Sequence, residues 1–447
     1  YLPAVSEAPI DGTFVADSTP PFLPDRGFLY FNLNNGTLAL SFSEVVNVSS
    51  VQPTRIVLQS YFETPEVTYT LTGGSVLSGY HPGPASTAVV IALSDTDANA
   101  IKAAQGLCTS RATCFISLSA AFLADGAGNP SEAAAGDSPF LSAQSFVADT
   151  TEPGLVSVEV DMDGGELVLE FDETVSAISL QPTLLTLQTA PWAGASAYSA
   201  NYTLTGGSVT ALSTTTLRVT MLTANVQAIK ALDLCLDPAA ADNCTLSAGA
   251  GFIQDTALTP NQALAIAPSS PANVSAITPD TTAPRLSAFN LDIDAGVMLI
   301  TFNEPVRRES VTVTEMTLQA TSASDAESVA LSGGSVTLQR ASPSDVGARI
   351  VRVVLLQSDV VAIRLNTALA TSLANTYLSA TNNTARDMSQ NLMEPVPVSD
   401  ARQSSVYQAD ITPAALVSFS LDMAQGTLAL TFTDVVDVST LRVSGLA

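Results

Sequence analysis

A sixteen-residue phrase occurs four times along the chain, and its spacing strongly limits the possible folds. The copies are GTLALSFSEVVNVSSV at 36–51, GELVLEFDETVSAISL at 165–180, GVMLITFNEPVRRESV at 296–311 and GTLALTFTDVVDVSTL at 426–441. Their phenylalanines, Phe42, Phe171, Phe302 and Phe432, are 129, 131 and 130 residues apart. So regular a period indicates tandem domains of about 130 residues rather than a solenoid of short repeats.

Other landmarks recur in the same order within the repeats. The phrase LTGGSV or LSGGSV occurs at 71–76, 204–209 and 331–336, and AIK or AIR follows at 100–102, 228–230 and 362–364. Each repeat opens on an acid, a Thr and a Pro: DSTPP from Asp17, DTTEP from Asp149, DTTAP from Asp280 and DITPA from Asp410.

These landmarks divide the chain into five segments. We expect the last strand of a preceding repeat at 1–16, repeats at 17–148, 149–279 and 280–409, and the beginning of an incomplete fourth repeat at 410–447. The first boundary rests on the phrase FVAD at 14–17, which matches FVAD at 146–149 and YQAD at 407–410. The chain is therefore expected to be a window on a longer repetitive polypeptide.

The repeated phrase has the pattern of a half-buried strand. Leu38, Leu40 and Phe42 alternate with Ala39 and Ser41, which is the period of two expected of β-structure. The residues before each copy, such as NNG or DGG, suit a hairpin turn that needs positive φ. In the first repeat, further strands are expected at 55–59, 67–71, 87–93, 114–119 and 143–148, with a turn or bulge at Gly73–Gly74.

One short helix per repeat is expected at the AIK phrase, over 97–104 in the first repeat and 224–232 in the second. About two turns are too few for a helical layer, so this is a crossover helix on a β domain. Seven or so short strands with regular turns predict an all-β chain of tandem immunoglobulin-like β-sandwich domains, each with one short crossover helix. A barrel topology is the alternative.

The pattern D-x-T-x-P, F-x-L-D and G-x-L-x-L-x-F-x-E-x-V resembles the immunoglobulin-like repeats of large extracellular proteins. Bacterial surface-layer and adhesin modules carry a strand similar to SFSEVV and TFNEPV of this chain. The repeats also resemble those of mastigoneme-type filament proteins of microalgae and protists. The resemblance covers the whole chain and implies a fold more firmly than a function.

Composition excludes two classes of partner. The chain has 42 acids against 16 bases and a net charge of −26, so it repels nucleic acid and anionic membrane surfaces. No uninterrupted apolar run is long enough to insert into a membrane.

The four cysteines form two close couples, Cys108 with Cys114 and Cys235 with Cys244. Without a His or another Cys nearby, they predict small-loop disulfides rather than a zinc site. Disulfides favour an oxidising compartment, so we expect an extracellular or cell-surface protein.

Acids recur at two positions of the repeat. One set opens the repeats and the other follows the repeated strand: Asp17, Asp149, Asp280 and Asp410, with Glu44, Glu173, Glu304 and Asp434. Calcium bound at the domain junctions is one interpretation, since this ion takes six to eight oxygens. The other is that each acid ends a strand on its solvent side and prevents edge-to-edge aggregation. No other cofactor is expected.

Six sequons predict N-linked glycans in a secreted eukaryotic protein. They are at Asn35, Asn47, Asn201, Asn243, Asn273 and Asn382.

Catalytic residues are not expected. The single histidine, His81, lies in an unrepeated loop flanked by proline, and Trp192 is the only tryptophan. Each repeat is built from the same parts, with no segment typical of a catalytic insertion, so the sequence predicts that the protein is not an enzyme.

The regular period and missing catalytic parts favour a structural subunit of an extracellular filament, fibril or surface coat, whose partners are copies of itself. The alternatives are the stalk of a cell-surface adhesin, or accessory modules of a secreted polysaccharide-acting protein.

Overall fold

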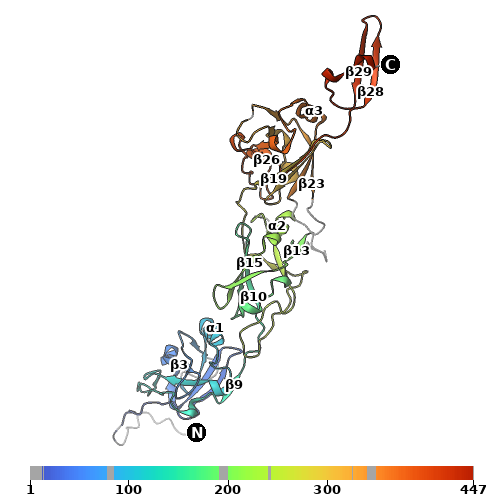
Figure 1. Cartoon of the computed structure of the whole chain (residues 1–447). Helices are drawn as coiled ribbons and strands as arrows, with labels where there is room; N and C mark the ends of the chain where they lie inside the picture. Colours follow the sequence, from blue (N-terminus) through green and yellow to red (C-terminus); the bar gives the residue numbers. More distant parts are fainter. Residues whose placement is uncertain are drawn as a thin grey trace, which may run out of the picture.

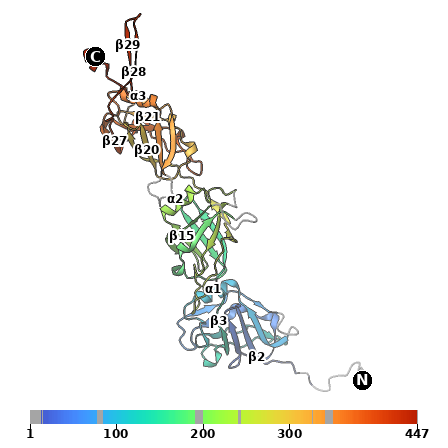
Figure 2. The same cartoon turned by 90° about the vertical axis from the view of Figure 1, so that its right-hand side faces the viewer.

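The computed structural model describes residues 13, 15–77, 85–190, 200–239, 243–324, 326–339 and 349–445. His81, Trp192 and nearly all of segment 1–16 lie outside these residues. The chain forms an elongated row of three β-sandwiches that ends in a two-stranded hairpin (Figures 1 and 2). The predicted all-β fold with tandem sandwiches is confirmed.

Among its described residues, the first sandwich contains nine strands and one α-helix. Its elements are β1 (Phe28–Asn32), β2 (Thr37–Asn47), β3 (Ile56–Gln59), β4 (Thr68–Thr70), β5 (Ser75–Val76), β6 (Ala85–Ala92), α1 (Asp95–Ala103), β7 (Phe115–Leu118), β8 (Ala124–Asp125) and β9 (Ser145–Val147). One sheet has the order β5-β6-β2-β1-β9, with β8 also on β2, and the other has the order β4-β3-β7.

The second sandwich repeats this arrangement. Its elements are β10 (Leu155–Asp161), β11 (Glu166–Phe171), β12 (Leu185–Gln188), β13 (Asn201–Thr203), β14 (Gly207–Ala211), β15 (Thr216–Met221), α2 (Thr223–Ala231), β16 (Thr245–Ala248), β17 (Ala272–Asn273) and β18 (Ala276–Thr278). The sheets are β14-β15-β11-β10-β18 and β13-β12-β16-β17.

The third sandwich has the same order. Its elements are β19 (Leu286–Asp292), β20 (Val297–Phe302), β21 (Met316–Gln319), β22 (Ser328–Ala330), β23 (Gly334–Gln339), β24 (Ile350–Leu355), α3 (Gln357–Leu365), β25 (Tyr377–Ala380), β26 (Arg402–Gln403) and β27 (Val406–Gln408). The sheets are β23-β24-β20-β19-β27 and β22-β21-β25-β26.

The repeated phrase forms the second strand of each sandwich, as its alternation predicts. In the second sandwich, β10 and β11 pair antiparallel with Asp161 opposite Glu166. Asp161 Oδ1 accepts hydrogen bonds from the amides of Asp163 and Gly164, and Gly165 has a φ of +70°, which glycine adopts without strain. The turn chemistry therefore sets the hairpin register.

Both sheets contribute to the core of each sandwich. In the second, Leu167 and Leu169 of β11 belong to the same buried cluster as Leu187 of β12 and Leu246 of β16, and all four are fully buried. The first and last strands of each sandwich pair in parallel, for example Val160 of β10 with Ile277 of β18. Each last strand thus ends next to the hairpin tip of its own sandwich.

The helix crosses from one sheet to the other, as predicted, but α1 begins two residues before the expected position. Ser94 accepts a hydrogen bond from the amide of Asp97 and so caps the helix at Asp95. The sequence also missed the shortest strands of the first sandwich, β5 and β8, because two residues are too few to show alternation. Figure 1 places α1, α2 and α3 at the end of each sandwich that faces the next element.

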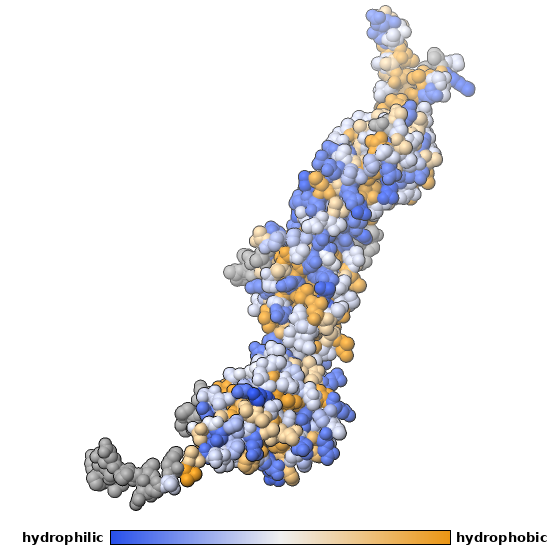
Figure 3. Space-filling model, turned by 90° about the vertical axis from the view of Figure 1, so that its left-hand side faces the viewer, coloured by the Kyte–Doolittle hydropathy of each residue, from blue (hydrophilic) through white to orange (hydrophobic). Residues whose placement is uncertain are grey.

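The last two strands form a hairpin, β28 (Leu416–Asp422) and β29 (Thr427–Phe432). Phe419 is 67% exposed, although Phe289, at the same position of β19, is fully buried. Figure 3 shows this apolar surface in orange on the shaft of the hairpin. An isolated hairpin of this kind has no second sheet to cover its apolar face.

Candidate functional site at the sandwich junctions

A lysine in the last turn of α1 links the first sandwich to the second. Lys102 Nζ lies 2.8 Å from Asp149 Oδ2 and also donates a hydrogen bond to Glu173 Oε2. The side chains of Lys102, Asp149 and Glu173 are 10%, 1% and 7% exposed. The lysine of the AIK phrase in one repeat therefore forms ion pairs with two acids of the next repeat.

The second junction repeats this ion pair. Lys230 Nζ of α2 lies 2.6 Å from Asp280 Oδ2 and 2.8 Å from Glu304 Oε2. All three side chains are buried. The interpretation in which this acid ends its strand on the solvent side is therefore wrong for Glu173 and Glu304.

Arginine takes the place of lysine at the third junction. Arg364 of α3 contacts Asp410 Oδ2 at 3.3 Å and pairs with Asp434. Its Nη2 also donates to the carbonyl of Ile293 at 2.7 Å. Ile293 lies just beyond β19, so the guanidinium connects the hairpin end of the third sandwich with the β28–β29 segment.

A third acid and an asparagine join the acids around Glu44, Glu173 and Glu304, and the sequence analysis missed both. Asp255 has a carboxylate oxygen within 4.8 Å of those of Asp149 and Glu173. Asn261 donates to Asp255 Oδ2 at 2.7 Å and to the carbonyl of Asp149 at 3.4 Å. The same pairs are Asp125 with Asn129 and Asp387 with Asn391. The signal was a recurring Asp and Asn before the last strands, in DGAGN, DTALTPN and DMSQN.

Burial shapes the electrostatics of the junction. It raises the pKa of Glu173 and of Glu304 to about 7, against the attraction of the neighbouring lysine. Burial alone would lower the pKa of Lys230, but its hydrogen bonds to Asp280 and Glu304 outweigh this and the pKa is raised. The lysine therefore stays charged, whereas burial favours the protonated form of the glutamate.

The hairpin tip of each sandwich holds the linker that follows it. Asp163 Oδ1 accepts hydrogen bonds from the Thr281 amide at 2.9 Å, the Thr281 hydroxyl at 3.1 Å and the Thr282 hydroxyl at 3.0 Å. Asn34 receives the same three bonds from Thr150 and Thr151. Asp294 accepts from the amides of Ile411 and Thr412. The Thr positions of the repeated opening phrase thus fix the path of the linker.

The GG phrase positions the helix that carries the cation. Asp97, fully buried in α1, accepts hydrogen bonds from the Thr72 amide and hydroxyl and from the Gly73 amide. These bonds hold the pKa of Asp97 below its usual range although burial opposes them. Asn225 and Asp359 bind the same turn in the next two sandwiches. Two repeated motifs are therefore parts of one junction.

The predicted calcium residues are brought together in this arrangement. Oxygens of Asp149, Glu173 and Asp255 cluster within 4.8 Å, as do those of Asp280, Glu304 and Asp387. A lysine ammonium already contacts two acids of each cluster. The oxygens of Asp17, Glu44 and Asp125 form a third such cluster at the start of the first sandwich. Asp410 and Asp434 meet at Arg364.

Disulfides staple the loop after α1 and α2. Cys108 pairs with Cys114, and Cys235 with Cys244. The third sandwich keeps the same loop without cysteine: Ala370 has a φ of 51°, close to 46° in Cys108. There the Asn375 side chain accepts from the amides of Thr371 and Ser372 and donates to the carbonyl of Ala368.

The sequons differ in accessibility. Asn35, Asn201, Asn273 and Asn382 are exposed, whereas Asn47 and Asn243 are half-buried. The Asn243 amide nitrogen donates to the carbonyl of Asp233 at 2.6 Å.

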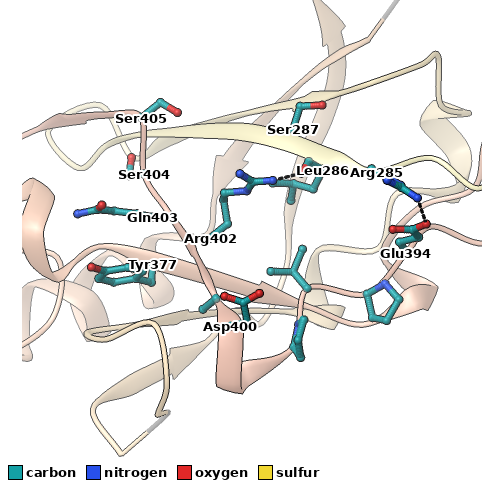
Figure 4. A pocket seen from close by; sticks show the side chains of 14 residues that line it. Arg285, Leu286, Ser287, Tyr377, Glu394, Asp400, Arg402, Gln403, Ser404 and Ser405 are labelled. Carbon is teal, nitrogen blue, oxygen red and sulfur yellow. Dashed lines mark hydrogen bonds and ion pairs between the residues drawn. The ribbon is translucent and has the colours of Figure 1, made fainter.

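An open polar groove of about 640 Å³ crosses the third sandwich (Figure 4). Arg285 pairs with Glu394 at 2.6 Å, and Arg402 donates to the carbonyl of Leu286 at 3.2 Å. No His or Cys is found among the described residues that line the groove.

No helix among the described residues is long and apolar enough to cross a membrane. No protein-family model matches the sequence, and comparison with curated proteins gives no match either.

Similar solved structures include the FN1–FN3 domains of chicken CNTN1, with 10% identity, coverage of 84% of this chain and 95% of that one, and a TM-score of 0.20. For the Escherichia coli adhesin FdeC, the identity is 12%, the coverage is 88% of this chain and 99% of that one, and the TM-score is 0.21. For the S-layer protein rSbsC, the identity is 10%, the coverage is 93% of this chain and 63% of that one, and the TM-score is 0.17. Such low TM-scores carry no argument, so the fold assignment rests on the strand order of this chain.

Proposed function

We propose that this chain is a rigid structural segment of an extracellular filament, fibril or surface coat. The observation that carries the proposal is the recurrence of one junction design at three successive linkers: a helix-borne cation on two acids, and a hairpin tip bonded to the linker. A binding or catalytic domain needs no such repetition. A rod needs the same rigid junction at every linker, because each linker that is not held in place acts as a hinge.

The linkers themselves support this role. They run over residues 148–154, 279–285 and 409–415, and each contains a proline, which fixes φ and restricts its predecessor. Proline, tip hydrogen bonds and buried ion pairs act on the same short segment. The paired cysteines support secretion, where disulfides persist.

The test is negative-stain electron microscopy of the secreted chain, with the distribution of bend angles measured at each junction. A rod gives narrow distributions and a constant length. A quadruple variant, Asn34→Ala, Lys102→Met, Asp163→Ala and Lys230→Met, is expected to broaden both inner junctions. If the native particles already bend freely, the proposal fails.

Assembly into filaments requires a second measurement. Sedimentation velocity over a hundredfold range of concentration should show end-to-end oligomers, and microscopy should show strands of rods. An adhesin stalk predicts rods that stay separate, and accessory modules predict binding to a polysaccharide surface. Retention on insoluble polysaccharide, with no oligomers, would favour that last alternative.

A further inference from the structure

The start of the first sandwich carries a complete receiving half of the junction. Asp17, Glu44 and Asp125 cluster as do Asp149, Glu173 and Asp255 in the second sandwich. Asn129 donates to the Asp17 carbonyl at 3.1 Å, as Asn261 and Asn391 do to Asp149 and Asp280. The Thr19 amide bonds to Asp17 Oδ1 as Thr151 and Thr282 do to their aspartates.

One component differs between these junctions. Among the described residues, no basic side chain forms an ion pair with Asp17, Glu44 or Asp125, whereas a lysine lies on each of the other two clusters. Asp17 is exposed and Glu44 half-buried, although Asp280 and Glu304 are only 3% and 2% exposed. In those cases the preceding sandwich covers the acids.

Three carboxylates meet at this position, and none of them forms an ion pair with a described residue. Glu44 keeps the arrangement of Glu173 and Glu304: in all three, Oε1 is buried without a hydrogen bond, and in the latter two the lysine contacts Oε2. Burial, Asp17 and Asp125 together raise the pKa of Glu44. Bringing a positive charge to this cluster would relieve the repulsion among three carboxylates.

We propose that Asp17, Glu44 and Asp125 form a socket for the lysine or arginine at the end of the crossover helix of a further repeat unit, joined directly ahead of Asp17. The partner also presents Asn or Asp at its hairpin tip, to accept from the amide of Ser18 and the hydroxyl of Thr19. Ser18 and Thr19 stand where Thr150 and Thr151 contact Asn34.

A small ion is the weaker occupant. The equivalent acids contact lysine in both other clusters, and their oxygens are arranged for one ammonium between an aspartate and a glutamate. Calcium prefers six to eight oxygen ligands, more than these three side chains supply with single atoms. Calcium binding is therefore an outcome that would overturn the proposal.

The test joins a copy of residues 149–279 directly ahead of Asp17, in place of residues 1–16. This copy folds around a closed core of its own and supplies a Lys230 and an Asp163. Hydrogen exchange read by mass spectrometry should show at least tenfold stronger protection of residues 17–19 and 44 in the extended chain. Lys230→Met in the added copy, or Glu44→Gln, should remove most of the gain.

Two variants and two controls keep the outcomes distinct. The effects of Lys230→Met and Glu44→Gln must be non-additive, because they break the same pair. Unchanged protection in the extended chain, or additive effects, would overturn the proposal. So would protection of the native chain by 1 mM calcium, reversed by chelator, or protection that appears on concentrating the native chain.

The inference rests on the proposed rod function, but the two can fail separately. If native particles are straight but the socket residues gain no protection in the extended chain, the rod proposal stands and the socket proposal fails. If native particles are flexible but the socket residues are protected in the extended chain, the socket proposal stands and the rod proposal fails.

Discussion

The Lys230 ammonium lies 2.8 Å from Glu304 Oε2, although 74 residues separate them in the chain. The lysine belongs to the helix of the second sandwich and the glutamate to the strand end of the third. Both are buried, so each compensates the other in a low-dielectric environment. The contact makes a domain boundary as specific as a domain core.

Removing this lysine should weaken the junction strongly. Lys230→Met leaves Asp280, Glu304 and Asp387 buried without a cation, and breaking one side of a buried pair costs about 3–5 kcal/mol. The loss of unfolding free energy is measured by urea unfolding, with hydrogen exchange at residues 280–304 as the readout. Arg218→Met is the matched control, since its pair with Glu166 is 41% and 28% exposed and is worth less than about 1 kcal/mol. Equal effects of the two variants would contradict the role of the buried pair.

Stability should fall as the pH rises toward neutrality. The pKa of Glu173 and Glu304 is raised to about 7 in the folded chain, from an ordinary value of 4.5. The folded state therefore binds these protons more tightly, and the free energy of unfolding decreases between about pH 4.5 and 7, then levels off. One pKa unit is worth about 1.4 kcal/mol, so raising the pKa from 4.5 to about 7 changes the free energy of unfolding by about 3 kcal/mol per junction.

The double variant Glu173→Gln, Glu304→Gln isolates this effect. Its melting temperature, compared with that of the native chain from pH 4.5 to 8, should lack this component of the pH dependence. Glu159→Gln, at an exposed position, is the control and should leave the native profile unchanged. Identical profiles for the native chain and the double variant would show that another group titrates.

The hairpin tip should control bending. Asp163→Ala removes the acceptor of three hydrogen bonds from Thr281 and Thr282, each typically worth about 1 kcal/mol. Small-angle scattering should show a shorter, more variable particle. Asp163→Asn should remain straight, because Asn34 accepts the same bonds at the first junction. If the Asp163→Ala variant stays rigid, the hydrogen bonds of the hairpin tip do not control bending, and the ion pair alone holds the junction.

Reduction should affect two sandwiches and spare the third. Each disulfide closes a short loop, so Cys235→Ser with Cys244→Ser should cost about 2–3 kcal/mol. Hydrogen exchange in β16 should accelerate in this variant. β25 serves as the internal control, because the third sandwich holds its loop through Asn375. Loss of protection in β25 on reduction would contradict independent cores.

Glycan occupancy should follow accessibility. Expressed in a eukaryotic secretory host, Asn382 should be modified, since it is exposed. Asn243 should be poorly occupied, because its amide nitrogen is bonded to the Asp233 carbonyl. Peptide mass spectrometry before and after enzymatic deglycosylation gives the occupancy of each site. Full modification at Asn243 would show that the sugar is added before this loop folds.

The alternation Leu38, Leu40, Phe42 and the turn residues before it predicted the central hairpin, because strand faces and tight turns depend on neighbouring residues. The crossover helix followed from its local pattern in the same way. The junction could not be predicted from a local pattern, since the AIK lysine and the acids of the next repeat are far apart in the sequence and were interpreted separately.

The sequence by itself determined the period, the hairpins, the crossover helices and the cysteine couples, all of which are local features. Only the tertiary structure decided that Lys102 reaches Glu173 and that Asn261 holds the Asp149 carbonyl. Charge compensation depends on distance through space, and that distance is set by how one sandwich stacks on the next. At two junctions, acids that the sequence suggested as calcium ligands already form ion pairs with a lysine of the preceding repeat.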